Sequence, residues 1–515
     1  MRNYFATAPA ERAALEAHGV QLAMEHTMAL AALIRTDPKS AIEHAVPMVA
    51  RQDLPPLIVS RLEERVNVQG AFKVIGAVPD GVQNTEKQAA PISRRVTAQD
   101  GREWRAYTYG TRAQMGTRLA ASLNGVAVGG DFAVSDSPLR ILEVGERPLP
   151  RGREVIKECP VSGITSPVTS GPQGNLPPIS SNTPAYETSQ RIVYVCSGGH
   201  ICAVQQQLSE EETAQHWTSL GVQLNSGAGS GPVVSPFSVP TTWTTGQRKL
   251  LYIRATFPDT RADPQSEAEC HDSLRQMCDY MVQASYGRCY FTYTVAPLVV
   301  LPYPEAWYLQ YDDDTGLGDD LIQSHARTVA KTMGYDTDQY DFDVVRWDGV
   351  IGSYGGQAYV GSKGVWLKTN AVGTLCHELG HNLGVWHSNF WETTPPSVIG
   401  PGQNLEYGNL FDVMGNSASV GHYTAFFKNV IGWLPSDTYW EIHSSGTYRI
   451  HQYDYGTANP NQRFALRIPR DAERTYWCEF RQRSNNTALL NGLMVTWDSW
   501  GLYGIGGFGG SPTTG

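Results

Sequence analysis

The sequence predicts an α+β protein of several domains, and three features carry that prediction. Residues 249–383 alternate between short β-branched or aromatic runs and longer helical runs, a pattern typical of helices packed on a sheet. Residues 9–66 are rich in Ala, Leu, Met and Glu, which favour helix. From about residue 436 the chain returns to strand-like runs. At ~150 residues per domain, a chain of 515 residues is expected to form about three domains.

The N-terminal region, 1–158, is expected to be helical over 9–66 and β-rich over 70–148. Its first helix breaks at DPKS, and two shorter helices are expected at 41–49 and 55–66, the second with proline near its start. Short β-branched or aromatic runs separated by glycine and aspartate then predict strands. These strands are expected at 71–78, 103–110 and 125–134.

A linker containing a small hairpin is expected at 159–245, because 159–190 and 225–243 are rich in Pro, Ser, Thr and Gly. It separates the N-terminal region from a central domain at 246–435. Strands of that domain are expected at 249–257, 288–301, 341–347, 357–361 and 364–368, and helices at 267–287 and 318–334. The C-terminal region, 436–515, is expected to be β-rich, with strands at 447–453, 463–469, 475–483 and 492–497. Its glycine-rich end favours a chain that continues beyond residue 515.

Composition narrows the class of protein. Hydrophobic residues make up 41% of the chain and charged residues 17%, which is enough apolar surface for real cores and excludes global disorder. A net charge of −10 without a basic stripe argues against a nucleic-acid partner. The first residues lack the pattern of a signal peptide, and the apolar run at 27–34 is too short for a transmembrane segment.

The number of cysteines indicates the cellular location of the protein. Eight cysteines are an even number, which favours disulfide bonds and a secreted or extracytoplasmic protein whose signal peptide is not visible in this chain. Cys196 and Cys202 flank SGGHI and could close a local hairpin. The alternative is that several of the cysteines are buried thiols.

The segment CHELGHNLGVWH, at 376–387, lies in a predicted helix. Asn370 can cap a helix over 371–383, and Gly384 follows where a helix commonly ends in a left-handed residue. Apolar residues at helical spacing form one stripe that is expected to be buried. They are Val372, Leu375, Leu379 and Leu383.

The polar residues of this helix have the spacing of a metal site. His377 and His381 are four residues apart, so both imidazoles can point at one ion, and a turn at Gly384 would bring back His387 as a third ligand. Three imidazoles and a water form an open, catalytic zinc site. Glu378 can take a proton from the zinc-bound water as that water attacks a peptide carbonyl. The alternative is a helix with ordinary core or surface histidines.

The pattern His-Glu-x-x-His-x-x-Gly-x-x-His resembles the metzincin signature of zinc metalloproteases. The resemblance implies a catalytic domain with a twisted mixed sheet, two main helices and a methionine turn, for which Met414 in DVMG is the candidate. The runs YGxxxDVMG, IGWL and YWCEFRQR, within 249–498, resemble the gametolysin-like branch. That branch implies a secreted endopeptidase made as a latent zymogen, with 1–158 as its pro-region and inhibitor, and with protein or glycoprotein substrates.

Two departures from the family pattern leave the oxyanion donor open. Asn409 stands where this branch has an acidic residue, and Asn416 where some metzincins have a tyrosine that faces the metal. Candidates for oxyanion or substrate contacts are Tyr407, Tyr423 and Tyr359. The resemblance also implies that 356–366 forms the upper edge of the cleft and pairs with an extended peptide. The alternative for 356–366 is an ordinary inner strand.

The sequence leaves alternatives open for the residue that keeps the protein latent and for the function itself. Cys159 could block the zinc as a thiolate, or it could be a disulfide partner or free thiol. Calcium is not indicated by the sequence. A catalytically silent binding or adhesion protein is a second hypothesis, but it would have no need of Glu378 as a base. A zinc amidase acting on cell-wall peptides is a third, which the same metal site would serve.

Overall fold

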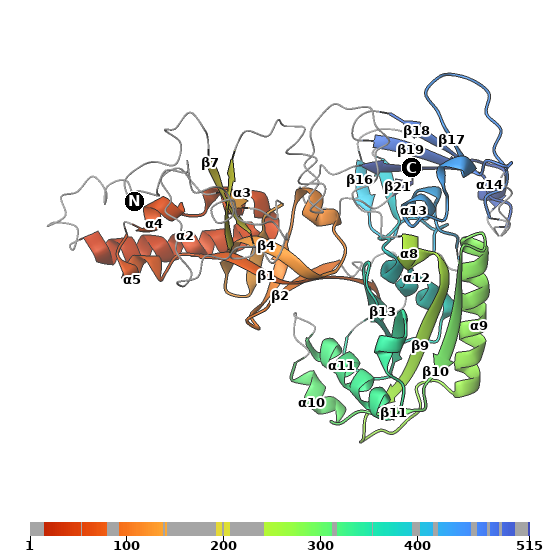
Figure 1. Cartoon of the computed structure of the whole chain (residues 1–515), viewed down its shortest axis with the longest axis horizontal. Coiled ribbons are helices and arrows are strands. Elements are labelled where there is room, and N and C mark those ends of the chain that lie inside the picture. The colour runs from red at the N-terminus through yellow and green to blue at the C-terminus, as the bar shows by residue number, and fades with distance from the viewer. Residues whose placement is uncertain are drawn as a thin grey trace, which may run out of the picture.

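The computed structural model has an α+β fold, with a large mixed sheet, a second smaller sheet and several helices (Figure 1). This agrees with the predicted fold class. The structure describes residues 15–52, 54–79, 92–136, 140–141, 192–197, 200–205, 241–311, 317–352, 354–393, 402–415, 421–454, 461–470, 474–483, 487–499 and 513–514.

The N-terminal region is helical as predicted, but the bounds of its helices differ, and the predicted start at residue 9 lies outside the described residues. Helix α2 (Glu16–Thr36) stops at Asp37, whose carboxylate caps α3 (Pro38–His44) by accepting the Ser40 N–H at 3.0 Å. The short helices α4 (Met48–Gln52) and α5 (Pro56–Val59) follow. The prediction of helix up to residue 66 was wrong, because a strand begins at residue 64. The carboxylate of the buried Glu63 accepts the Val46 N–H and forms an ion pair with Arg51.

Five strands form the β-rich part of this region. The predicted strands at 71–78 and 103–110 are present, although the second ends at residue 107. The single strand predicted at 125–134 is two strands, which the Gly129–Gly130 turn joins. The five are β1 (Glu64–Pro79), β2 (Ser93–Ala98), β3 (Glu103–Tyr107), β4 (Arg118–Val128) and β5 (Asp131–Val134). Among residues 140–205, β6 (Arg140–Ile141), β7 (Ile192–Ser197) and β8 (His200–Gln205) form a small sheet that contains the predicted hairpin.

The central region follows the predicted alternation of strands and helices. Its strands are β9 (Gly246–Thr256), β10 (Cys289–Val295), β11 (Val299–Val300), β12 (Phe342–Arg346), β13 (Tyr354–Tyr359) and β14 (Val365–Leu367). Its helices are α8 (Thr241–Thr244), α9 (Glu267–Ala284), α10 (Glu305–Leu309), α11 (Leu317–Thr332) and α12 (Val372–Leu383). A reciprocal capping box between Ser266 and Glu269 starts α9.

Two cores cover the two faces of the central sheet. Alternate residues of β9 point to opposite faces, as the period of a strand requires. Leu250 and Tyr252 pack in the core that includes α9 and α12, whereas Leu251 and Ile253 pack in the core that includes α11. Strands β10, β9, β12 and β14 are parallel, and β13 pairs antiparallel with β14. The sheet therefore presents β13 beside the helix that carries the histidine motif.

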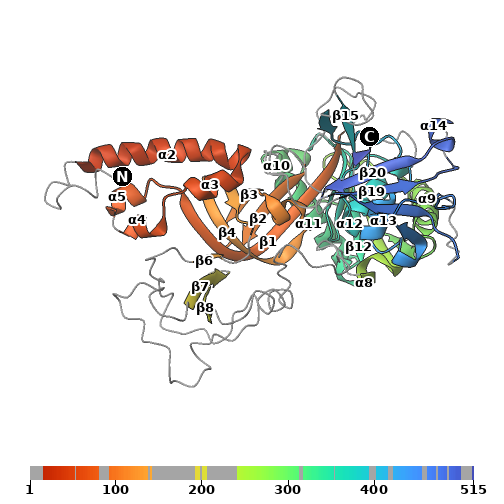
Figure 2. The same cartoon turned by 90° about the horizontal axis from the view of Figure 1, so that it is seen from above.

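The long strand β1 joins the N-terminal strands to the central sheet. It pairs antiparallel with β2 and β4 through its earlier residues and with β13 through Ile75–Pro79. The strand order is β10-β9-β12-β14-β13-β1-β2-β3-β5-β4, with β11 beside β9. Figure 2 shows β1 running from below α2 and α3 to the central region. The predicted cleft-edge segment therefore has a neighbour supplied by the same chain.

The second sheet has the strand order β16-β15-β21-β20-β19-β18-β17, and it combines β15 and β16 of the central region with strands of the C-terminal region. The predicted strand at 447–453 was wrong. This segment makes isolated contacts instead, such as the Tyr453 N–H to the Phe480 carbonyl at 2.7 Å. The elements are β15 (Asn389–Thr393), β16 (Gly402–Leu405), α13 (Ala425–Val430), β17 (Tyr439–Glu441), β18 (Ala465–Pro469), β19 (Arg474–Glu479), α14 (Thr487–Leu490), β20 (Met494–Ser499) and β21 (Thr513–Thr514).

Within the described residues, no helix is both long enough and apolar enough to cross a membrane.

Candidate metal centre

Helix α12 holds the motif, and its end is formed as predicted. Its predicted apolar stripe packs inward, with Leu375, Leu379 and Leu383 buried. Gly384 has φ 110°, a left-handed conformation that favours glycine, and its N–H donates to the carbonyls of Gly380 and His381. The chain then turns back toward the helix.

The start of the helix differs from the prediction. Ala371 is the N-cap, and no side chain caps the helix. The Asn370 carboxamide oxygen instead accepts the Arg346 Nε–H at 3.0 Å. The prediction of Asn370 as the cap was therefore wrong, because a long-range partner on β12 competes for its side chain.

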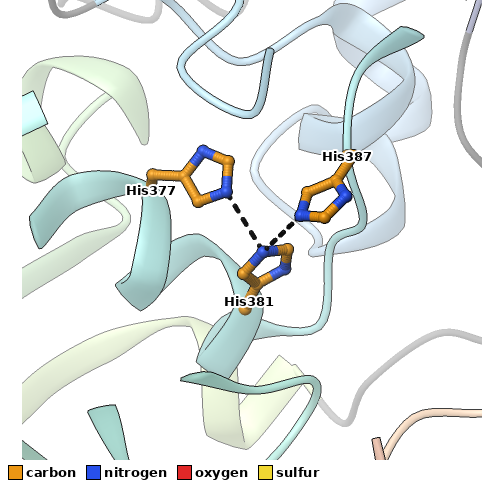
Figure 3. Close-up of side chains that lie close together, drawn as sticks. All are labelled: His377, His381 and His387. Atoms are coloured by element: carbon orange, nitrogen blue, oxygen red, sulfur yellow. Dashed lines mark hydrogen bonds between the residues drawn. The ribbon is translucent and has the colours of Figure 1, made fainter. Parts of the chain in front are cut away.

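The three predicted ligands converge on one point. Nε2 of His381 lies 3.1 Å from Nε2 of His377 and 3.1 Å from Nε2 of His387 (Figure 3). All three side chains are buried. His377 and His381 project from one face of α12, and the turn at Gly384 returns His387 to face them.

The hydrogen bonds of the other ring nitrogens leave the Nε2 atoms free to bind a cation. Nδ1 of His377 is 2.7 Å from the Val413 carbonyl, and Nδ1 of His381 is 2.9 Å from the Val385 carbonyl. A carbonyl can only accept, so both Nδ1 atoms carry the proton and both Nε2 atoms carry a lone pair. The Nδ1 of His387 lies 2.7 Å from Oε1 of Glu406.

Burial keeps the imidazoles neutral. It lowers the pKa of His387 to about 3. Burial, followed by the influence of His387, lowers the pKa of His377 to about 3, and the pKa of His381 lies well below its usual value, mainly because of burial. Neutral imidazole is the form that binds metals. Two of the three Nε2 pairs are 3.1 Å apart, and neutral lone pairs at that distance repel one another unless they share a cation.

The spacing of the triad fits a metal ion. Two imidazole nitrogens that each lie about 2.0–2.1 Å from one tetrahedral zinc ion are about 3.3 Å apart. The separations of His381 from His377 and from His387, 3.1 Å each, are close to that value, and all three ligand atoms lie within 4.8 Å of one another. His377, His381 and His387 could therefore hold a metal ion. Their hydrogen-bonded Nδ1 atoms also provide the outer contacts that orient such ligands.

Glu378 lies beside the triad with an unpaired carboxyl group. Its side chain is 0% exposed, and within the described part of the chain neither carboxyl oxygen has a hydrogen-bond partner. Burial raises its pKa well above the usual range for a carboxyl group. It packs against β13 at Gly356, where an added Cβ would lie 2.7 Å from Oε1. A buried carboxyl without a partner is costly to keep in a fold, which favours a chemical role.

Glu406 is a site residue that was not predicted. It accepts from His387, and burial raises its pKa to about 8 against the opposing influence of Arg94. The guanidinium of Arg94, on β2, also lies 5.3 Å from the centre of the Trp386 ring. Glu406 directly precedes the predicted candidate Tyr407, but no local pattern marks it, because its contact with His387 spans 19 residues.

Of the three tyrosine candidates, only Tyr407 lies against the triad. Its ring centre is 3.9 Å from that of His387, and its hydroxyl donates to the Ala77 carbonyl of β1. Its φ of 60° is strained for a residue with a side chain, and such strain is often found at functional sites. Burial raises its pKa well above the usual range.

The other two tyrosines have supporting contacts. The Tyr423 hydroxyl donates to the Cys376 carbonyl at 2.9 Å, so Tyr423 supports α12. The Tyr359 hydroxyl donates to Asp320 at 3.2 Å, and its ring packs edge-on against Trp366. Neither hydroxyl is directed at the histidines, so neither is placed as an oxyanion donor.

Met414 packs under the helix. A Cβ added at Gly380, between the two helical histidines, would lie 2.5 Å from its sulfur. The Met414 carbonyl accepts the Ser388 N–H at 2.8 Å, and the preceding Val413 carbonyl accepts from His377. Asp412 holds this turn by accepting the N–H groups of Met414 and Thr424. The methionine segment thus supports the triad from below without binding to it.

Asn409 has a structural role here, since its amide donates to the Ser388 hydroxyl at 2.9 Å and its oxygen accepts the Phe411 N–H. Asn416 lies outside the described residues.

No described cysteine side chain belongs to the group of residues that could hold a metal ion. Cys159 lies outside the described residues, as do the side chains of Cys196 and Cys202. The other five are free thiols: Cys270, Cys278, Cys289, Cys376 and Cys478. The alternative of buried thiols therefore holds for most of these five, and no disulfide links any two of them.

Comparisons with known proteins do not identify the chain. No protein-family model matches it, and no curated protein matches it. A solved structure described as "Structure of a chaperone-substrate complex" is similar over 36% of this chain and 33% of that chain, with 14% identity and a TM-score of 0.21. A TM-score this low does not indicate a shared fold. The function must therefore be inferred from the residues of the site.

Proposed function

We propose that this protein is a metzincin-like zinc endopeptidase made as a latent, secreted zymogen. The observation that carries the proposal is the buried triad with its free Nε2 atoms beside the unpaired Glu378. The signature spacing and the place of Met414 support the same family, and the gametolysin-like branch rests on the sequence runs alone.

The residues of the chain divide the work of peptide hydrolysis. Zinc held by the triad would polarise the attacked carbonyl and bring the pKa of its water near 7. Glu378 takes the proton of the attacking water and passes it to the leaving amine. Tyr407 donates a hydrogen bond to the carbonyl oxygen as negative charge develops on it. Strand β13 binds the substrate backbone, which favours extended chains.

The N-terminal region acts as the inhibitor of the same site. Strand β1 lies between β13 and Tyr407, on the side from which a substrate strand would bind. The role of Cys159 as a zinc-blocking thiolate is not needed to account for latency. Disulfide bonds and secretion remain part of the proposal through the cysteine count and the family resemblance.

The direct test is casein hydrolysis by the purified chain before and after limited proteolysis within 159–245. We expect activity to appear after cleavage and to fall by about 10³-fold or more in Glu378→Gln, because the general base is lost. Glu267→Gln, an exposed glutamate on α9, is the matched control and should keep full activity.

Three outcomes would contradict the proposal. Hydrolysis that persists in Glu378→Gln would remove the proposed base. Bound zinc without hydrolysis under any activation would favour a metal-containing binding protein. Cleavage of cell-wall peptides but not of casein would favour the amidase.

A further inference from the structure

Residues 76–78 of β1 contact the catalytic region on both edges of the strand. β2 covers β1 only as far as Ile75, which pairs with Ser93. Beyond that point β1 pairs with β13 alone, with Gly76 opposite Ala358 and Val78 opposite Gly356. No described strand covers the second edge of residues 76–78; the Ala77 carbonyl on that edge accepts from Tyr407, and His381 lies against one face of the strand at Gly76.

The hydrogen-bond pattern assigns each carbonyl to one edge. The Val360 N–H donates to the Val74 carbonyl at 2.8 Å, so Val74 belongs to a hydrogen-bonded pair. These pairs alternate along an antiparallel ladder, so Gly76 and Val78 also bond to β13, whereas Ala77 points its carbonyl away from β13. The Ala77 carbonyl accepts from the Tyr407 hydroxyl. A carbonyl of the chain itself thus occupies the position proposed for a reacting carbonyl.

Gly76 makes the closest approach to the triad. A Cβ at this position would lie 2.4 Å from Nε2 of His381, 2.7 Å from Cε1 and 2.9 Å from Cδ2. These three distances are similar, so the added atom would sit over the face of the ring and not in its plane. The lone pair of Nε2 lies in the ring plane and remains available to a metal. His381 cannot move aside easily, because its Nδ1 is bound to the Val385 carbonyl.

We propose that residues 76–78 are a built-in substrate mimic, and that the β13 site selects extended peptides with glycine opposite Ala358. The strand direction is antiparallel to β13, its backbone fills the hydrogen bonds of that edge, and its middle carbonyl meets Tyr407. Only glycine fits against the face of His381. That such a peptide is a substrate rests on the proposed endopeptidase function; that it binds there does not.

Charged contacts next to this segment hold the mimic in place. Lys73 lies 3.0 Å and Arg95 lies 3.3 Å from the same carboxylate oxygen of Asp320, on α11. The Thr117 N–H donates to the Val360 carbonyl at 2.6 Å, which ties β1 and its neighbours to the end of β13. These contacts must break for β1 to separate from β13 once the linker has been cut, and that separation releases the site.

The test uses the full chain carrying Glu378→Gln, so that no peptide is cleaved, with and without Gly76→Ala. The added methyl should displace β1, and hydrogen exchange of the β13 amides at 354–359 should accelerate by about tenfold or more. Gly130→Ala is the matched control, because Gly130 lies in the β4–β5 turn with open space around its Cα. It should leave the exchange of β13 unchanged.

A labelled peptide with the sequence of residues 71–79 then probes the vacated site by fluorescence anisotropy. The Gly76→Ala chain should bind it, and a peptide with alanine in place of its glycine should bind at least roughly tenfold more weakly. The Gly130→Ala chain should bind neither, because its own strand fills the site. Val78→Pro is a second variant that breaks the pairing through a lost N–H without touching His381, and it should also bind the glycine peptide.

Three results would overturn the inference. They are unchanged β13 exchange in both folded variants, equal binding of the two peptides, and binding of the glycine peptide by the Gly130→Ala chain. All three are read without hydrolysis, so they are separate from a failure of the endopeptidase proposal, which the casein assay detects.

Discussion

Replacing Glu406 by alanine is expected to weaken metal binding, because Glu406 is the one side chain that orients a ligand of the described triad. The Nδ1 atoms of His377 and His381 donate to backbone carbonyls, which substitution cannot remove. The Nδ1 of His387 donates to Oε1 of Glu406 at 2.7 Å. The experiment therefore changes the partner of one ligand and leaves the other two ligands untouched.

The magnitude follows from burial. His387 is 0% exposed, so its Nδ1–H would lose its acceptor without access to water. An unsatisfied buried donor costs about 1–3 kcal/mol. That range corresponds to about 5- to 150-fold in affinity. Removal of the outer partner of a ligating histidine in other proteins costs about 10- to 100-fold, which agrees.

The assay is competition for zinc against a chromophoric chelator at fixed pH. We expect Glu406→Ala to bind zinc about 10- to 100-fold more weakly, and Glu406→Gln to lose less because its amide oxygen still accepts. Glu392→Ala, an exposed glutamate on β15, is the control. Circular dichroism of the metal-free proteins checks that both fold. Zinc affinities of Glu406→Ala and the parent within twofold of each other would show that Glu406 does not orient His387 for metal binding.

Three further changes test the support of the site and the fold. Gly380→Ala would press a methyl against the Met414 sulfur and should lower the free energy of unfolding by about 1–3 kcal/mol in denaturant titrations; equal stability would show that Met414 moves aside freely. Tyr423→Phe removes a buried hydrogen bond to a carbonyl of α12 and should cost about 1–3 kcal/mol in the same titration, whereas an unchanged midpoint would count against that support. Arg327→Ala leaves Asp343 buried without its ion pair and should cost about 3–5 kcal/mol, and a loss below 1 kcal/mol would mean that water reaches the carboxylate.

The parts of the site that lie within one helix and its turn could be predicted from the sequence. The spacing of His377 and His381 requires only a regular helix, and the left-handed Gly384 returns His387 after a single tight turn. Both depend on local geometry that residue identity largely determines. The place of Glu378 follows from its position beside His377 on the same helix, whereas its lack of a hydrogen-bond partner among the described residues is a result of tertiary packing.

Contacts between distant segments could not be predicted. Glu406 has no local signature, and Tyr407 meets the Ala77 carbonyl across 330 residues. Which of three tyrosines faces the triad depends on the path of the segment at 402–415, where the φ of Tyr407 is itself unusual. Tertiary packing determines such contacts, and single-residue propensities do not contain it.

The prediction of secondary structure failed for the same reason at two segments, where contacts with distant residues differ from what the local pattern indicates. Residues 447–453 have strand-like composition, but no described strand pairs with them, and their N–H groups bond to scattered carbonyls. Residues 60–63 favour helix, but Glu63 is buried, where it accepts the Val46 N–H and forms an ion pair with Arg51. In both cases the tertiary partners of the backbone and side chains determined the conformation.

X-ray absorption at the zinc edge on the purified full chain would identify the ligands of a bound zinc ion directly. We expect zinc surrounded by three imidazole nitrogens at about 2.0–2.1 Å, and loss of that signal in His381→Ala but not in His443→Ala, a change at an exposed histidine. Zinc bound only by sulfur at about 2.3 Å, or an unchanged spectrum in His381→Ala, would contradict the assignment of the triad as the metal site.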